Sequence, residues 1–547
     1  MGLETIYSKF GKKNSSLLIV YGIIVLIMFP LQGIYLPRQY TKMIQNLTEN
    51  SKGMITRVFI VIIIVLIVTT TLSAARETIS IELFPKRLLH YTRKEIYERL
   101  IDRYSTEYKQ VKSADTIERI NGISRNITFH AEWLIRQGLP LVLAMLVIIV
   151  YFFTKNKTIG IIALSGFLLN VVVTVHYGNS ISNESIQRES ILINTSQKIN
   201  NSLDNLKNIY INSKSQQNKN TVQEKNTAHS KKLEKELSVG RDMKVIVSVV
   251  TLVTLFSVIY FLYRQLFGPN KTSTSVDRFE AGAIIFIYLT YMGWMNELFM
   301  DMPFAFHRLG ILNASKEFLD DIFKHNQTGK KRSGITDGEI KFKNVSFAID
   351  NSEIITDESY FFEGKKITCI KGRSGSGKSI TAQLIVGLYK PTKGEILLDG
   401  INIQELDQDY LRKSIIYVNQ LDNMFEESVK YNMLYGTTGK EAELKRLLEQ
   451  YNLEPIYETI GGIDTVIEPN GSNISTGMKK VIMVIRGILK SKATIYIFDE
   501  PTAGLDTNTT NKILEMIETE CSGKTTIIIT HSDVVTGMCQ KNILISR

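Results

Sequence analysis

Long apolar runs alternate with polar stretches over roughly the first 300 residues of this 547-residue chain. With a few residues of slack at each end, six runs are long enough to cross about 30 Å of hydrocarbon. They are 17–36, 58–75, 139–153, 158–175, 245–263 and 281–300. Farther on, short apolar strands separated by polar turns replace these runs. The pattern predicts an all-α membrane domain with six spans over 1–323, a basic linker over 324–337, and a soluble α/β domain over 338–547.

The distribution of positive charge predicts the orientation of the spans. The long segments 76–132 and 177–244 carry eleven Lys plus Arg each, whereas the connections on the opposite side carry two to four. Positive loops stay on the cytoplasmic side of a membrane. We therefore expect an integral, multi-pass protein of the plasma or inner membrane, with its C-terminal domain in the cytoplasm.

The two long cytoplasmic segments are themselves expected to be helical. The stretch 91–111 repeats apolar residues at i,i+4 spacing from Ile96 through Leu100 to Tyr108, with charges on the other face. Such helices are too polar to lie in lipid, so we expect the membrane helices to continue into the cytoplasm. Inside the spans, Asn170, Glu280, Asn296 and Glu297 are interpreted as helix–helix or headgroup contacts, with a substrate contact as the alternative.

Overall composition adds two expectations. The net charge of +11 does not gather on an aromatic-studded stripe, so nucleic acid is not expected as a partner. The three cysteines, Cys369, Cys521 and Cys539, have no partner at metal or redox spacing along the chain. We expect them to be reduced residues of the soluble domain's core.

The soluble domain opens with a phosphate-binding signal. The β run "KKITCI" leads into "KGRSGSGKSITAQLIVGLY", which fits G-x-x-x-x-G-K-[ST]. Glycines let the backbone fold into a nest of N–H groups around phosphates at the start of a helix. Lys378 would reach the β- and γ-phosphates, and Ser379 would contribute to a Mg²⁺ site. The predicted nucleotide-binding residues here are Gly372, Arg373, Ser374, Gly375, Ser376, Gly377, Lys378, Ser379 and Ile380.

Two later strands end in groups suited to hydrolysis. "ATIYIFDEP" is an apolar strand ending in two carboxylates. Asp499 is predicted to hold the Mg²⁺ shell, and Glu500 to orient and polarise the attacking water. His531 follows the strand "TTIIIT", where it could contact the γ-phosphate. These residues predict hydrolysis of a magnesium-bound nucleoside triphosphate.

Taken together, the chain resembles an ATP-binding cassette (ABC) exporter half-transporter, with six spans followed by one cassette. The resemblance covers nearly the whole chain, by layout in the membrane part and residue by residue in the cassette. Gly372 to Ser379 match Walker A, and "IYIFDE" matches Walker B. The resemblance implies that Gln420 of "YVNQ" senses Mg²⁺, that Asp506 of "AGLD" is the D-loop acid, and that His531 is the switch histidine.

The family signature LSGGQ is altered in this chain. "NISTGMKK" keeps the serine and one glycine as Ser475 and Gly477, which the resemblance implies contact the γ-phosphate bound to the opposite subunit. Thr476 replaces the other glycine, and Met478 replaces the glutamine. A Cβ at position 476 restricts the backbone, so we expect a weakened contact. Similarly, Ile349 stands where the family stacks an aromatic ring on adenine, although Phe347 or Tyr360 could compensate.

The function expected from these features is export of a hydrophobic or amphipathic cargo driven by ATP hydrolysis with Mg²⁺. Because the signature and the P-loop meet across an interface in this family, a second half-transporter is required as a partner. A homodimer is favoured over a heterodimer, since every hydrolytic residue is present. A subunit that binds ATP but hydrolyses it poorly without a partner is the main alternative. The six spans disfavour a soluble ATPase, and a nucleotide-gated channel is a further alternative; the cargo could be a lipid, a peptide or a drug-like small molecule.

Overall fold

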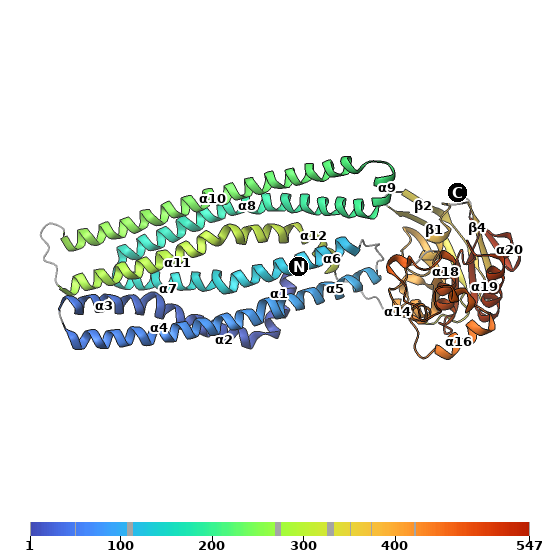
Figure 1. The fold of residues 1–547 in the computed structure, drawn as a ribbon, viewed down its shortest axis with the longest axis horizontal. Coiled ribbons are helices and arrows are strands. Elements are labelled where there is room, and N and C mark those ends of the chain that lie inside the picture. Colours follow the sequence, from blue (N-terminus) through green and yellow to red (C-terminus); the bar gives the residue numbers. More distant parts are fainter. Residues whose placement is uncertain are drawn as a thin grey trace. The chain divides into compact units, whose positions relative to one another are not determined.

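A computed structural model describes residues 2–49, 51–106, 113–267, 275–324, 333–349, 352–373, 375–420 and 423–545. The chain forms two compact units, a helical one that ends at Lys324 and an α/β one that follows (Figure 1). Residues 325–332 of the expected linker lie outside the described residues. The all-α and α/β classes predicted for the two parts are confirmed.

The first unit consists of helices. Three segments, η1, η2 and η3, are π-helical turns set between α-helices. In chain order the elements are α1 (Gly2–Lys13), α2 (Ser15–Pro30), η1 (Leu31–Tyr35), α3 (Leu36–Thr48), α4 (Lys52–Ile81), η2 (Glu82–Leu88), α5 (Leu89–Thr106), α6 (Ser113–Trp133), η3 (Leu134–Gly138), α7 (Leu139–Lys155), α8 (Lys157–Asp204), α9 (Leu206–Ile211), α10 (Ser215–Phe267), α11 (Ser275–Ala314) and α12 (Lys316–Ile322).

Among the described residues, six continuous helical stretches are long and apolar enough to cross a membrane. They are Ser15–Thr48, Lys52–Tyr104, Thr116–Lys155, Lys157–Asp204, Ser215–Phe267 and Asp277–Ala314. Each contains one predicted span and most extend well beyond it, as the helical pattern of the polar segments predicted. In the amphipathic stretch 91–111, Ile96 and Leu100 are buried, while Tyr108 lies outside the described residues. The protein is therefore an integral membrane protein.

Prolines accompany all three π-helical turns. Pro30 is the last residue of α2 and immediately precedes η1. Pro85 lies inside η2, and Pro140 lies in the first turn of α7, just after η3. Proline has no N–H and its ring clashes with the preceding turn, so a helix widens or bends around it. Pro30 and Pro140 thus have a local structural role at these turns.

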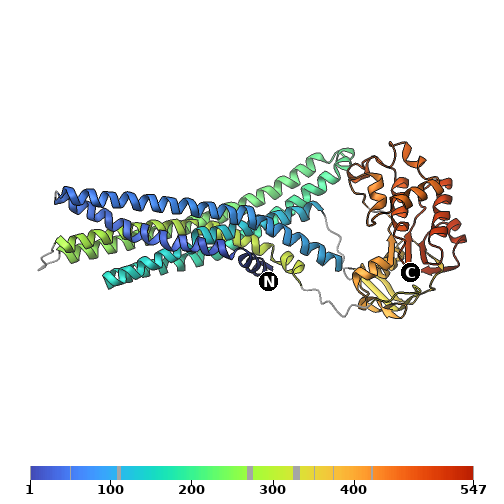
Figure 2. The same ribbon diagram turned by 90° about the horizontal axis from the view of Figure 1, so that it is seen from below.

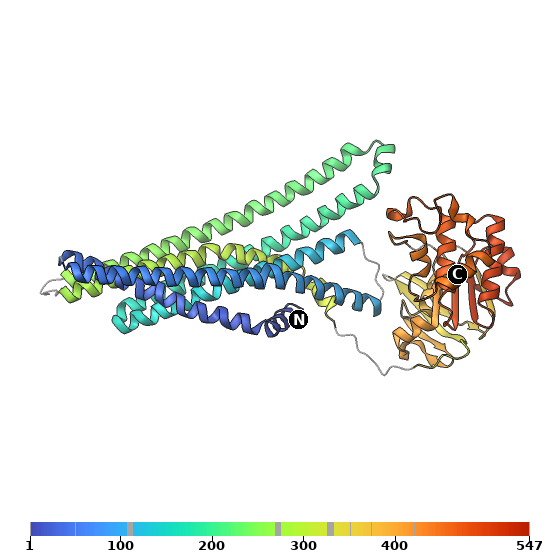
Figure 3. The same cartoon turned by 60° about the horizontal axis from the view of Figure 1, so that its bottom comes forward.

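Close packing between helices explains one polar group inside the spans. Helices α8 and α10 lie side by side (Figure 2, Figure 3). A Cβ on Gly166 would come within 2.6 Å of Thr254, so glycine allows this approach. Nearby, the fully buried Asn170 donates to the Thr251 hydroxyl over 3.4 Å. Asn170 therefore makes the helix–helix contact that was the favoured interpretation.

Two glutamates inside the predicted spans also have protein partners. The Glu280 carboxylate lies 3.3 Å from Arg38 and 3.4 Å from Lys155. Glu297 accepts a hydrogen bond of 3.5 Å from Gln137. Intramembrane carboxylates are stabilised by such partners because lipid cannot solvate them.

The second unit contains two sheets. The strands are β1 (Ile340–Ile349), β2 (Ser352–Glu358), β3 (Phe361–Phe362), β4 (Ile367–Gly372), β5 (Lys393–Leu398), β6 (Ile401–Asn402), β7 (Ile415–Val418), β8 (Ile495–Asp499), β9 (Thr525–Ile529) and β10 (Lys541–Ile545). The helices are α13 (Lys378–Ile385), η4 (Ile403–Glu405), α14 (Gln408–Ser414), α15 (Val429–Leu434), α16 (Glu441–Gln450), α17 (Pro455–Glu458), η5 (Pro469–Gly471), α18 (Thr476–Ile488), α19 (Thr507–Glu520) and α20 (Asp533–Gly537). An antiparallel sheet has the order β2-β1-β5-β6, with β3 paired to β1, and a parallel sheet has the order β10-β4-β9-β8-β7.

The parallel sheet positions the candidate chemistry. Every residue of β8 and β9 is buried, as expected for central parallel strands covered on both faces. Because the strands are parallel, the carboxyl ends of β4, β7, β8 and β9 lie along one edge. Open α/β sheets bind ligands outside this edge.

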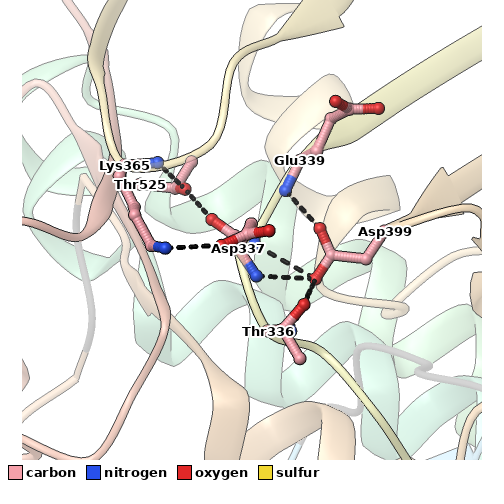
Figure 4. A network of polar contacts seen from close by, with 7 residues as sticks. Thr336, Asp337, Glu339, Lys365, Asp399 and Thr525 are labelled. Carbon is pink, nitrogen blue, oxygen red and sulfur yellow. Dashed lines mark hydrogen bonds and ion pairs between the residues drawn. The ribbon is translucent and has the colours of Figure 1, made fainter.

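A carboxylate anchors the start of this unit to its antiparallel sheet. Asp399 accepts hydrogen bonds from the backbone N–H groups of 336, 337, 338 and 339, over 2.6–3.1 Å (Figure 4). Beside it, the Thr525 hydroxyl donates to the Asp337 carbonyl and accepts from the Lys365 N–H. Burial alone would raise the pKa of Asp399, but the four N–H donors together lower it below its ordinary value.

The prediction of three reduced cysteines is wrong for two of them. Cys369 in β4 and Cys539 just after α20 form a disulfide, with their Cα atoms 5.7 Å apart. The two positions are 170 residues apart in sequence, and the parallel pairing of β4 with β10 brings them together. Cys521 is free and buried, as predicted.

Candidate functional site

The P-loop joins β4 to α13. A Cβ at Gly372 would lie 2.4 Å from the Ile545 carbonyl, so only glycine fits where β4 meets β10. Gly375 and Gly377 have φ values of 77° and 92°, a conformation that L side chains rarely adopt. Lys378 is 7% exposed, and its Nζ donates to the carbonyls of Gly372 and Arg373 over 2.9 and 2.8 Å.

This loop has the features of a phosphate cradle. A Cβ built at Gly375 would meet nothing within 4 Å, so space is open there. The Ser376 hydroxyl is buried and has no hydrogen-bond partner within the part of the chain that is described. Burial lowers the pKa of Lys378, and the nearby Glu500 and Asp499 oppose this shift. Ser374 lies outside the described residues, Arg373 is exposed, and Ile380 packs against the core.

The predicted metal ligands lie together. Asp499 ends β8, is 3% exposed, and accepts hydrogen bonds from the hydroxyls of Ser379 and Tyr417. Burial raises the pKa of Asp499 above its ordinary value, and these bonds oppose the shift only in part. A buried carboxylate beside a hydroxyl is a donor set that suits Mg²⁺, which takes oxygen ligands and few protein groups. The residues present thus fit a magnesium ion.

The three predicted catalytic residues also converge. The Glu500 carboxylate accepts a hydrogen bond of 2.6 Å from the Gln420 side-chain amide, which follows β7. The other carboxylate oxygen of Glu500 lies 3.7 Å from the Nε2 atom of His531, a residue that follows β9. Three strand ends therefore bring an amide, a carboxylate and an imidazole to one point.

The backbone of Glu500 is held in an uncommon conformation. Its φ is 50°, in the left-handed region, which costs a non-glycine residue roughly 1–2 kcal/mol. Its N–H donates to the Ile529 carbonyl over 2.9 Å. Its carbonyl accepts a bond of 3.0 Å from Lys480, a 6% exposed side chain on α18. These two bonds fix the direction of the carboxylate.

Ser475 and Asp506 each cap a helix. The Ser475 hydroxyl accepts from the Met478 N–H over 3.1 Å at the start of α18. The Asp506 carboxylate accepts from the Thr509 N–H over 2.9 Å at the start of α19, and this contact lowers the pKa of Asp506. Both ends present backbone N–H groups and a positive helix dipole, which suit an anion.

Replacement of the signature glycine by Thr476 causes no backbone strain. Thr476 is the first residue of α18, and it is not among the non-glycine residues that have a positive φ. At Gly477, by contrast, a Cβ would come within 3.1 Å of Leu505. The cost expected at position 476 therefore concerns close approach to a ligand and not backbone conformation.

The residues expected to compensate for Ile349 are already packed. Phe347 is 7% exposed, and its ring lies against Tyr389 with centroids 5.3 Å apart. The ring of Tyr360 packs against Phe342 at 5.7 Å. Neither Phe347 nor Tyr360 is free to replace a stacking ring at position 349.

Sequence reasoning missed two residues at this site, Tyr417 and Lys480. Tyr417 is on β7, three residues before Gln420, and no local signal marked its hydroxyl as a partner of Asp499. Lys480 lies 20 residues before Glu500, and no local signal connects the two positions.

Comparison with known proteins agrees with this geometry. Residues 356–503 match the family model of the ABC transporter, a range that contains the P-loop, Gln420, the signature and both strand-end acids. The chain is 18% identical to a bacterial Atm1-family ABC exporter solved with ATP bound, with a TM-score of 0.84 over 97% of this chain and 94% of that one. The chain has the fold of an ABC exporter, and its second unit contains an ABC transporter domain. An ABC transporter domain implies that this cassette binds ATP.

Curated relatives match part of the chain. An ATP-dependent lipid A-core flippase of Haemophilus influenzae (strain 86-028NP) is 30% identical over 278 residues, 49% of this chain and 47% of the relative. The protein with the same name from Pasteurella multocida (strain Pm70) is 33% identical over 216 residues, 39% of this chain and 37% of the relative. The chain thus matches less than half the length of these flippases.

Proposed function

We propose that the protein is one half of an ATP-driven exporter of an amphipathic cargo. The observation that carries this function is the placement of Glu500 between Gln420 and His531, beside the Ser379–Asp499 pair, in a chain with six membrane helices. A site that only bound nucleotide would not require a second strand-end acid held toward two polar partners. The names of the curated flippases support an amphipathic cargo.

Each side chain has a proposed role in hydrolysis. Glu500 orients and polarises the attacking water, and its bond to Gln420 fixes which carboxylate oxygen faces that water. Lys378 exchanges its bonds to the loop carbonyls for bonds to the phosphates, with little cost because it is already buried. Ser379 and Asp499, together with Gln420, would hold Mg²⁺, which supplies positive charge against the phosphate oxygens. His531 is placed to contact the γ-phosphate.

The complete site requires a second copy of the cassette. Ser475, Gly477 and Asp506 start helices whose N–H groups would face the phosphates bound by the partner subunit. A homodimer is favoured because Glu500, Gln420 and His531 are all present in this chain. ATP-driven closure of the pair would switch the membrane helices between inward- and outward-facing states in the plasma or inner membrane, with the cassettes in the cytoplasm.

The second candidate is a partner-dependent subunit that binds ATP but hydrolyses it poorly alone. It is favoured by Ile349 at the stacking position, because Phe347 and Tyr360, the two rings expected to compensate, already pack against other rings. Thr476 and Met478 in the signature favour it as well.

ATPase activity of the purified full-length chain in liposomes tests both candidates. We expect wild-type protein to hydrolyse ATP, Glu500→Gln to lose nearly all turnover, and Glu515→Gln, an exposed position on α19, to behave as wild type. Turnover that rises with protein density in the liposomes supports the homodimer. Wild-type activity no higher than that of Glu500→Gln would overturn the first candidate in favour of the second.

A further inference from the structure

A cavity of about 770 Å³ lies among α8, α10 and α11, far along the chain from the residues of the ATP site. All three helices belong to the helical unit. Its polar lining includes Arg188 of α8, Glu236, Arg241 and Lys244 of α10, and His307 and Arg308 of α11. Its size suits a drug-sized or lipid-like molecule.

One part of the lining is apolar and exposed. Val245 and Val249 of α10 are 56% and 54% exposed, and Phe304 of α11 is 47% exposed. Such exposure of large apolar side chains marks a binding groove or a surface facing lipid. At Gly240 a Cβ would lie 3.4 Å from Pro303, so α10 and α11 come close at one end of the cavity.

The rest of the lining is strongly basic. Four arginine and lysine side chains line the cavity against a single carboxylate, Glu236. Buried Glu236 is already paired with His307 at 2.9 Å and with Arg188 at 3.3 Å. It therefore offsets Arg188, and the other three cations have no carboxylate partner among the lining residues.

Three of those cations face the cavity from two helices. Arg241 and Lys244 are exposed and lie three residues apart, on one face of α10. Arg241 has an exposed ion pair with Asp242, which contributes little when solvated. On α11, the guanidinium of Arg308 lies 4.7 Å from the centre of the Phe304 ring and donates to Asn126. The apolar and basic parts of the lining therefore meet at Phe304.

The predicted spans put the cavity at the depth of lipid headgroups. Val245 is the first residue of the predicted span 245–263, and the basic residues of α10 precede it. Arg308 follows the predicted span 281–300 by two turns of helix. The apolar wall thus begins where hydrocarbon begins, and the cations lie on the cytoplasmic side, where anionic headgroups gather.

We propose that this cavity binds an anionic lipid-like amphiphile of the cytoplasmic leaflet, its phosphate on Arg241, Lys244 and Arg308 and its acyl chain along Val245 and Val249. Charge and apolar surface are both complementary to such a ligand, and a neutral lipid or a free anion would satisfy only one of them. The inference rests on the proposed export function only in naming this class of amphiphile as cargo.

Binding of defined probes to purified full-length protein in detergent tests the site. The probes are oleoyl lysophosphatidic acid, monooleoylglycerol, which lacks the phosphate, and glycerol 3-phosphate, which lacks the chain. We expect lysophosphatidic acid to bind at least on the order of tenfold more tightly than either of the others. Equal binding of monooleoylglycerol, or of glycerol 3-phosphate, would overturn the proposal.

Matched variants locate the site. Arg241→Gln combined with Lys244→Gln should weaken lysophosphatidic acid binding on the order of tenfold or more, because each basic group near a headgroup contributes separately. The control pair, Lys219→Gln with Lys231→Gln, removes the same charge from exposed positions of α10 outside the cavity and should bind as wild type. Val249→Trp, which fills the apolar wall, should weaken binding independently. Unchanged binding in the first pair, or equal loss in the control pair, would overturn the site.

The same preparations separate this proposal from the proposed function. ATP binding and ATPase activity are measured with and without lysophosphatidic acid. Stimulated turnover in wild type that is lost in Arg241→Gln with Lys244→Gln supports binding of cargo. Absent ATPase activity with intact lipid binding would overturn the exporter function and leave the site standing, whereas active ATPase without lipid binding would overturn the site alone.

Discussion

Replacement of Lys480 by methionine should slow ATP hydrolysis without weakening ATP binding. Lys480 is 6% exposed, and its ammonium donates to the Glu500 carbonyl over 3.0 Å. Methionine keeps the length and apolar stem of the side chain but cannot donate a hydrogen bond. The change therefore releases one of the two backbone bonds that hold Glu500 at a φ of 50°.

The expected magnitude follows from that single bond. A hydrogen bond with one charged partner contributes about 1.5–3 kcal/mol. If all of it is lost from the placement of the Glu500 carboxylate in the transition state, kcat falls about 10- to 150-fold, since about 1.4 kcal/mol is a factor of ten. KM for ATP should change little, because Lys480 bonds a backbone carbonyl and not a residue of the P-loop.

Steady-state ATPase kinetics of the full-length chain in liposomes provide the measurement. Lys480→Arg, which retains a donor and a charge, should recover part of kcat. Lys492→Met removes a charge from an exposed position and serves as the matched control. A kcat for Lys480→Met within about twofold of wild type, or a loss confined to KM, would refute the positioning role.

Two further changes test the cassette. Asp399→Asn should lower the free energy of unfolding at pH 7 by on the order of 1–2 kcal/mol, because the amide has no charge and one acceptor oxygen in place of two, so it cannot accept all four N–H bonds. Since the folded pKa of Asp399 is depressed, the carboxylate stabilises the fold above its unfolded pKa of about 3.9, and this difference should vanish as pH falls through the lower folded pKa. Labelling of Cys521 in urea with a dithiodipyridine, which reacts with thiols at acid pH, reports cassette unfolding, because burial raises the pKa of that thiol to about 12 and keeps it unreactive in the fold; a difference that did not shrink as the pH falls below about 3.9 would contradict the assignment. Ile349→Tyr should tighten ATP binding by roughly 1–2 kcal/mol through stacking, measured by equilibrium ATP titration, and an unchanged dissociation constant would show that adenine does not lie at this position.

Local patterns were sufficient for the architecture and for the P-loop. The length of an apolar run decides whether it can span hydrocarbon, so six spans follow from the sequence alone. Gly375 and Gly377 mark positive φ angles because only glycine adopts them without strain. In the same way, an uninterrupted apolar strand ending in Asp499 indicates a buried parallel strand with its acid at the ligand-binding edge.

Contacts between distant segments were decided only by the tertiary structure. The disulfide of Cys369 with Cys539 joins positions 170 residues apart, which only the pairing of β4 with β10 brings together. Whether Phe347 is available to adenine depends on Tyr389 packing over it.

The contact of Lys480 and the charge of the basic cavity were likewise decided by the tertiary structure. Lysines occur throughout the chain, and outside the P-loop motif of Lys378 the sequence around a lysine does not indicate which group it will face. Which carbonyl Lys480 reaches, and which cations α10 and α11 present to one another, is fixed by the packing of helices and strands. The sequence alone thus determined the elements and the loop chemistry that depend on neighbours in the chain, while the partners of each side chain depended on packing between segments far apart in it.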